Sequence, residues 1–272
     1  MAEEDNNGNT SCCNEAQTAF LYLYLIYFAL VVWLGSTTVA KPMRLLATAV
    51  HEISHAIACW VTGGQVHKIE VYSNEGGVTH FAGGWRCLIS AAGYLGEAFW
   101  AMILVILSGG QRTSTVAAIA LMVALLVSLG YSPNRTLVLL NLFYVVLLAV
   151  LVYLEYRVFS PLLTYVILLF GVFVGTYAIV DIFHHLILGS NPRSDAYAAY
   201  EESGRCCPPR AIGVWWLILA IGMQLIGLYL ALILMSEECQ DHGWFSCIFH
   251  SKFDLDFIQF DWWPDEWEIF RR

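Results

Sequence analysis

Charged residues are scarce in this sequence. They make up 13% of the 272 residues, and only 13 residues are lysine or arginine, whereas an ordinary soluble domain has about 25% charged residues. With a net charge of -9, the chain also lacks the basic surface that binding to nucleic acid requires. Hydrophobic residues, by contrast, make up 58% of the chain. This composition excludes an ordinary soluble domain and predicts an integral, multi-pass membrane protein in contact with the lipid bilayer.

Other features are missing too. Residues 1–16 contain no lysine or arginine, so the apolar segment that follows is not preceded by the basic region of a cleaved signal peptide. We therefore interpret residues 17–34 as a retained membrane helix. The eight cysteines are scattered along the chain and predict no disulfide framework. No internal repeat is evident.

Apolar segments of membrane-spanning length recur along the chain and predict an all-α polytopic membrane protein with about seven transmembrane helices. The predicted spans are residues 17–34, 42–61, 85–107, 113–130, 136–154, 161–188 and 211–235. Between the second and third, residues 65–84 contain two short runs of β character, which predict a β-hairpin or a re-entrant element. The membrane domain, residues 17–235, would then lie between a disordered acidic tail (1–16) and an acidic, aromatic tail (236–272) that could bind a protein partner.

The most informative stretch lies in the second apolar segment, where residues 47–60 read A-T-A-V-H-E-I-S-H-A-I-A-C-W. His51, Glu52 and His55 form the pattern H-E-x-x-H, which on a helix places two imidazoles on one face with a carboxylate beside them. This pattern is typical of a zinc site with a glutamate as general base. Because ionisable residues are costly inside an apolar segment, their presence here indicates function.

A catalytic zinc ion has three protein ligands and one open position, so a third donor must come from elsewhere in the chain. The sixth apolar segment contains Asp181 and His185, which share one helix face at four-residue spacing, with His184 beside them. We predict that Asp181 is the third ligand and keep His185 as an alternative, either as a ligand or as a neighbour of one. Cys59 lies about 12 Å along the helix from His51, too far for one ion, and is expected in the core.

Three further features remain. Glu97 and the predicted hairpin each have two interpretations, and Asn141 has a structural one. Glu97, in the third segment, either contacts a metal ligand or faces a polar cavity near the membrane surface. Asn141, in the fifth, is expected to hydrogen-bond to a neighbouring helix. The predicted hairpin is either a simple turn or an edge strand that holds an extended substrate through main-chain hydrogen bonds.

Four short motifs together resemble the site-2-protease-like intramembrane metallopeptidases, in particular their compact branch without a PDZ domain. They are H-E-I-S-H-A at 51–56, A-G-Y-L-G at 92–96, the aspartate of V-D-I at 181, and S-D-A at 194–196. The similarity runs from about residue 42 to residue 199. It implies zinc held by His51, His55 and an aspartate, with Glu52 as the base.

The sequence departs from that family's pattern in two places. Asp181 is followed by Ile182 where better-known members have a glycine, and His184 and His185 stand where acidic residues are expected. Both departures concern the third ligand. They leave the H-E-x-x-H helix unaffected.

These patterns predict a zinc-dependent intramembrane endopeptidase that cleaves membrane-embedded protein substrates. Glu52 would take a proton from the attacking water and pass it to the leaving amine. Other hypotheses use the same sequence differently. A zinc hydrolase acting on a lipid-embedded non-peptide substrate would need the same residues, an inactive family member would serve as a binding or chaperone module, and a transporter-like bundle would contain these histidines incidentally.

Overall fold

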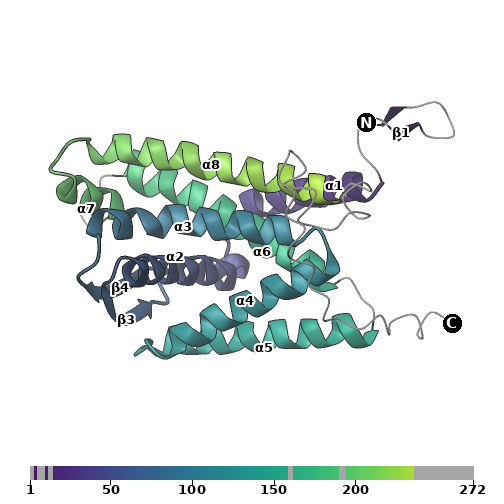
Figure 1. Cartoon of the computed structure of the whole chain (residues 1–272), viewed down its shortest axis with the longest axis horizontal. Helices are drawn as coiled ribbons and strands as arrows, with labels where there is room; N and C mark the ends of the chain where they lie inside the picture. Colours follow the sequence, from purple (N-terminus) through teal and green to yellow (C-terminus); the bar gives the residue numbers. More distant parts are fainter. Residues whose placement is uncertain (1–2, 5–9, 12–14, 159–161, 190–193, 236–272) are drawn as a thin grey trace, which may run out of the picture.

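A computed structural model describes residues 3–4, 10–11, 15–158, 162–189 and 194–235 of the chain. The predicted C-terminal tail, residues 236–272, and most of the predicted N-terminal tail lie outside these residues. The described part consists mainly of long helices that run along the length of the molecule (Figure 1), as the sequence predicts.

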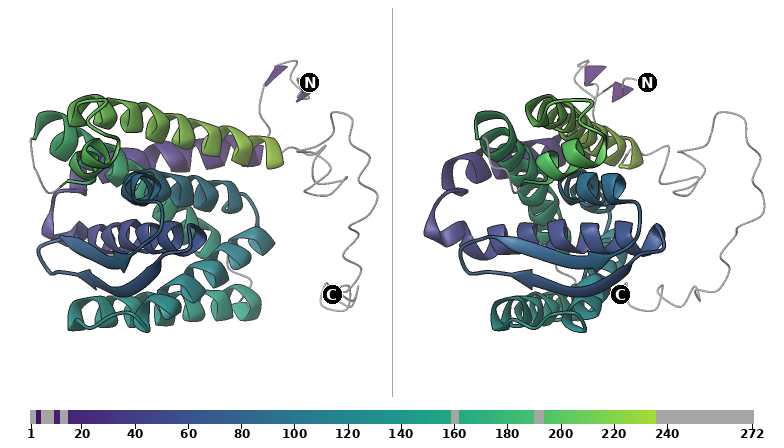
Figure 2. Two further views of the ribbon diagram at one scale, coloured as in Figure 1. Left: turned by 60° about the vertical axis from the view of Figure 1, so that its left-hand side comes forward. Right: turned by 90° about the vertical axis from the view of Figure 1, so that its left-hand side faces the viewer.

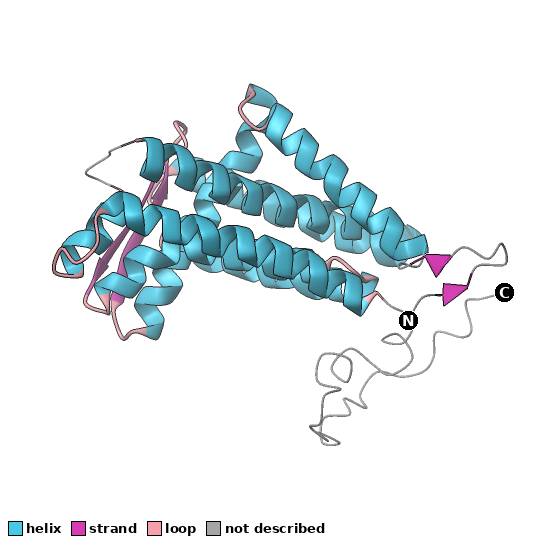
Figure 3. Cartoon of the chain, turned by 90° about the horizontal axis from the view of Figure 1, so that it is seen from above, coloured by secondary structure: helices cyan, strands magenta, loops and turns pink. Residues whose placement is uncertain are grey.

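Seven long helices form the bundle in the described part of the chain. They are α1 (Glu15–Leu34), α2 (Lys41–Val61), α3 (Arg86–Leu107), α4 (Gln111–Leu129), α5 (Arg135–Val158), α6 (Leu162–Asp181) and α8 (Pro209–Leu234). The shorter elements are β1 (Glu3–Glu4), β2 (Thr10–Ser11), the 3-10 turn η1 (Thr38–Ala40), β3 (Gln65–Val71), β4 (Gly77–Ala82), the π-helical turn η2 (Ile182–Leu188) that continues α6, and α7 (Asp195–Glu202). Figure 3 shows the long helices from above, with the strands of the hairpin crossing one end.

Six helices in the described part are long and apolar enough to cross a membrane: α1, α3, α4, α5, α6 with η2, and α8. The chain is therefore an integral, multi-pass membrane protein. The sequence predicts about seven spans, and the helix outside this set is α2, because it contains Lys41, Arg44 and the H-E-x-x-H residues. The helix packs against α3, α6 and the hairpin, so its polar residues lie inside the bundle.

The element between α2 and α3 is the predicted hairpin. Helix α2 ends at Val61 and is followed by Gly63, whose positive φ of 79° turns the chain back. Strands β3 and β4 then pair antiparallel, with Val71 opposite Gly77. Figure 2 shows the hairpin crossing the end of the bundle over α2.

The α4–α5 loop covers the outer edge of β3. The amide of Ile69 donates to the carbonyl of Tyr131 at 2.9 Å, and the side chain of Asn134 donates to the carbonyl of Val71. Strand β4 has no second strand beside it in the described part of the chain. The open edge of this small sheet is therefore that of β4.

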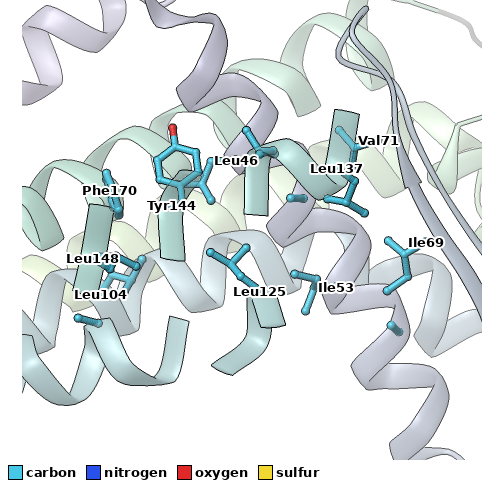
Figure 4. Close-up of a cluster of buried hydrophobic side chains, with 14 of the residues drawn as sticks. Leu46, Ile53, Ile69, Val71, Leu104, Leu125, Leu137, Tyr144, Leu148 and Phe170 are labelled. Atoms are coloured by element: carbon cyan, nitrogen blue, oxygen red, sulfur yellow. The ribbon is translucent and has the colours of Figure 1, made fainter. Parts of the chain in front are cut away.

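One cluster of buried apolar side chains connects the hairpin with the helices (Figure 4). Its members come from α2, β3, α3, α4, α5 and α6, and include Leu46, Ile53, Ile69, Leu104, Leu125, Leu137, Tyr144 and Phe170. Asn141 adds a polar link, since its amide donates to the carbonyl of Leu125 at 3.0 Å and to the hydroxyl of Ser128 at 2.6 Å. This confirms the interhelical role expected for Asn141.

Candidate metal centre

Helix α2 presents His51 and His55 on the same face, one turn apart. Their Nε2 atoms lie 3.2 Å from each other, and the two rings are inclined at 80°. Both side chains are largely buried. Because the spacing of four residues in a helix brings side chains onto one face, this pair follows directly from the H-E-x-x-H pattern.

The third donor beside this pair is Asp195, the first residue of α7. Ser194 caps the helix by accepting from the amide of Tyr197, which fixes the start of α7 at this point. One carboxylate oxygen of Asp195, Oδ2, lies 3.0 Å from Nε2 of His51 and 3.4 Å from Nε2 of His55. Within the described residues, these three side chains form the group that could hold a metal ion, and their donor atoms all lie within 4.8 Å of one another.

Asp181, the predicted third ligand, does not belong to this group. It ends α6, where its Oδ1 lies 2.7 Å from Nδ1 of His185. The side chains of His184 and His185 are exposed, so the alternative donor lies outside the group as well. The structure thus places Asp195, and not Asp181 or His185, beside the two imidazoles.

The sequence contained a signal for Asp195. It lies in the S-D-A motif, one of the four that carry the family resemblance. The i, i+4 spacing of Asp181 and His185 favours α6 instead, but in the structure that spacing allows a contact between those two residues. Cys59 behaves as expected, because it is fully buried in the apolar cluster.

Nδ1 of His55 lies 2.6 Å from the carbonyl oxygen of Ile89. A carbonyl oxygen can only accept, so Nδ1 carries the proton and Nε2 presents a lone pair to the centre. Gly93 provides the space in front of both rings, since a Cβ at this position would lie 2.4 Å from Nε2 of His51 and 2.5 Å from Nε2 of His55.

The donor set fits a tetrahedral zinc ion. Two ligand atoms bound to one such ion, at typical bond lengths, lie about 3.3 Å apart, and the three separations here are 3.0, 3.2 and 3.4 Å. Burial alone would raise the pKa of the Asp195 carboxyl. The neighbouring His55 and His51 lower this pKa by a larger amount, so the net shift is downward. Asp195 is therefore an anionic donor beside the imidazole nitrogens.

Glu52 is buried beside this centre and is held by the hairpin. The hydroxyl of Thr79 donates to Oε2 of Glu52 at 2.6 Å and contacts the main-chain oxygen of the same residue at 3.0 Å. Gly77 lies against the carboxylate, where a Cβ would come within 2.4 Å of Oε1. Strand β4 thus passes directly over the glutamate of the motif.

Two residues of α3 contact the outer side of His51. The carboxylate of Glu97 lies 3.3 Å from Nδ1, and the ring of Tyr94 packs edge-on at a centroid distance of 4.5 Å. Of the two interpretations of Glu97, the structure supports the one in which it contacts the histidine pair.

The chain matches a known protein family. The family model described as peptidase M50B-like matches residues 23–227, which include the whole of the centre described above. No curated protein and no solved structure matches the chain significantly.

Proposed function

Since this chain belongs to the peptidase M50B-like family, we propose that it is a zinc-dependent intramembrane endopeptidase that cleaves membrane-embedded protein substrates. The family and the six apolar helices make it a membrane metallopeptidase in general terms. The proposal adds the metal, its three ligands, the general base and the kind of substrate.

One observation carries the proposal: electron-donor atoms of His51, His55 and Asp195 converge at 3.0 to 3.4 Å. A carboxylate and two imidazole nitrogens at this spacing need a shared proton or a metal cation between them. Nitrogen and oxygen donors with a fourth position left open are the ligand set of a catalytic zinc site. We assign His51, His55 and Asp195 as the ligands.

Zinc bound here would supply a Lewis acid that polarises the scissile carbonyl and makes water a better nucleophile. Glu52 then accepts the proton of the attacking water at a carboxylate oxygen and delivers it to the nitrogen of the leaving amine. Gly93 adds no side-chain atom next to the two imidazoles, where a Cβ would collide with both Nε2 atoms. Burial of Glu52 and His55 excludes bulk water from this exchange.

A transmembrane helix hides its carbonyl groups in its own hydrogen bonds, so a substrate has to unwind before attack. The open edge of β4 would hold the unwound segment as an added strand. Because Thr79 of β4 contacts Glu52 directly, a strand paired with β4 would lie next to the proposed base. The hairpin, on this proposal, connects substrate binding with catalysis.

The decisive experiment compares four variants purified in detergent or reconstituted into liposomes. His51→Ala and Asp195→Ala should lose stoichiometric zinc, whereas Asp181→Ala should keep it. Glu52→Gln should retain zinc and fold but show no cleavage of a membrane-embedded reporter substrate.

Each alternative predicts a different result. A wild-type protein that binds no stoichiometric zinc would be an inactive family member, and the enzyme assignment would be abandoned. Zinc binding with hydrolysis of a lipid-embedded ester or amide, but of no peptide bond, would identify a non-peptide hydrolase. Zinc loss in Asp181→Ala with retention in Asp195→Ala would reverse the ligand assignment.

A further inference from the structure

We propose that Glu97 is a positioning residue for the metal centre: its carboxylate accepts the Nδ1 proton of His51 and thereby fixes the ring with Nε2 directed at the ion. This inference rests on the proposed zinc site. It assigns a role to Glu97, a buried acid that is neither a proposed ligand nor the proposed base.

Close packing of α2 against α3 brings the carboxylate to the ring. Gly93 and Gly96 lie on the contact between the two helices, where a Cβ on Gly96 would come within 2.6 Å of Cβ of Ser54. Glu97 lies one turn after Gly93 on the same side of α3, and its Oε2 reaches Nδ1 of His51 at 3.3 Å. Gly93 leaves room for the two imidazole rings, and Glu97 contacts Nδ1 of His51.

Apart from the contact with His51, no hydrogen bond among the described residues explains the presence of Glu97. Its side chain is only 2% exposed, it lies in a helix that is apolar enough to cross a membrane, and its Oε1 has no hydrogen-bond partner among the described residues. A buried carboxylate paired with one imidazole stabilises a fold less than an apolar residue of similar size would. The contact is therefore better explained by the metal centre than by folding.

The two histidines of the centre are held in the same way. Nδ1 of His55 donates to the carbonyl of Ile89, and Nδ1 of His51 faces a carboxylate. A partner on the outer nitrogen fixes the tautomer and the ring orientation of a ligating histidine, and a carboxylate also makes the imidazole a stronger donor. Glu97 gives His51 both properties.

The chain contains a matched control in α5. Glu155 is also buried, at 1% exposure, and its Oε1 also lacks a partner among the described residues. Its Oε2, however, accepts from the main-chain amide of Leu163 at 3.3 Å, at the beginning of α6. It supports a helix end and has no contact with the centre.

The test measures zinc affinity by competition with a chromophoric chelator in detergent. Glu97→Gln keeps the size of the side chain and removes its charge, and we expect zinc binding about 10- to 100-fold weaker than in the wild type. Glu155→Gln should bind zinc like the wild type. An unchanged affinity in Glu97→Gln, or an equal loss in both variants, would overturn the proposal.

A second measurement does not depend on any variant of Glu97. In the zinc-loaded wild type, 15N NMR of the imidazoles should show His51 protonated at Nδ1 and metal-bound at Nε2, with its signals identified by their loss in His51→Gln. The opposite tautomer would refute the role of Glu97. A wild type that binds no zinc would refute the proposed function as well, whereas normal zinc binding with an unchanged Glu97→Gln would refute this inference alone.

Discussion

The hydroxyl of Thr79 lies 2.6 Å from the carboxylate of Glu52. Twenty-seven residues separate the two, and the contact joins strand β4 to the helix that carries the histidine pair. The glutamate that we propose as general base is thus positioned by a residue of the strand that we propose as the substrate-binding edge. This relationship leads to the first prediction.

Thr79→Val removes the hydroxyl donor while keeping the shape of the side chain. A hydrogen bond to a charged group contributes ~1.5–3 kcal/mol, so we expect cleavage to slow by about 10-fold or more. Thr79→Ser keeps the donor and should retain most of the activity. The measurement is the cleavage rate at saturating substrate, with zinc content as a check. Equal activity of the valine and serine variants would show that the contact does not position the base.

Gly93→Ala places a methyl group where it would lie 2.4 Å from Nε2 of His51 and 2.5 Å from Nε2 of His55. At least one ring has to move, so we expect zinc affinity to fall by about 10-fold or more. Gly222→Ala in α8 is the control, because a Cβ there meets no atom within 4 Å. Zinc titration of both variants checks the prediction, and normal zinc binding by Gly93→Ala would contradict the close approach of α3 to the rings.

An ion pair holds the tip of the hairpin against α2. Arg44 of α2 forms a bidentate ion pair with Glu75, at 2.9 and 2.7 Å, and also donates to the carbonyls of Gly35 and Thr37. Both partners of the pair are partly buried. The arginine thus ties the hairpin and the α1–α2 connection to one point of α2.

Arg44→Gln should destabilise the protein by about 1–3 kcal/mol, because it leaves the carboxylate of Glu75 partly buried without its cation. Hydrogen exchange should increase in β3 and β4 before it increases in the helices. Lys68→Gln is the control, since Lys68 is 44% exposed in its pair with Glu70 and such surface pairs contribute little. Equal protection of the hairpin in both variants would argue against an anchoring role for Arg44.

The sequence was sufficient for the parts of the protein that depend on local patterns. Apolar runs predicted the membrane helices, and the composition of residues 65–84 predicted the hairpin. The fixed spacing of His51 and His55 predicted that their side chains would face the same point, because a helix determines that geometry within one turn. Among the predicted spans, α2 differs, because it is not one of the helices apolar enough to cross a membrane. Its polar residues are enclosed by other elements and need not face lipid.

The third donor could not be found in this way, because its position depends on how distant helices pack. Asp181 and His185 satisfy a local spacing rule, yet their side chains contact each other at the end of α6. Asp195 lies in a separate short helix, 144 residues after His51 in the chain, and the packing of α7 against α3 and α8 places it beside α2. The contact of Thr79 with Glu52 is of the same kind, because it depends on where the hairpin lies on α2.

The three donors of the centre come from two helices, two from α2 and one from α7. An ion shared by them is a cross-link between these helices, and its removal leaves the charge of Asp195 without a cation. We expect chelation to lower the melting temperature and to increase hydrogen exchange selectively in residues 195–202, with reversal on return of zinc. A ligand present at 100 times its dissociation constant stabilises a protein by about 2.7 kcal/mol, which is large enough to detect.

The matched control for this experiment is Asp195→Asn, which removes the cross-link at its α7 end. In this variant α7 should exchange rapidly before chelation, and the chelator should change the exchange of α7 no further. Helices α4 and α5 provide an internal reference, because they contribute no donor to the centre within the described residues. If chelation accelerates exchange equally in α5 and α7, the ion acts on the stability of the whole fold. If it changes neither, no ion joins α2 to α7, and Asp195 is not the third ligand.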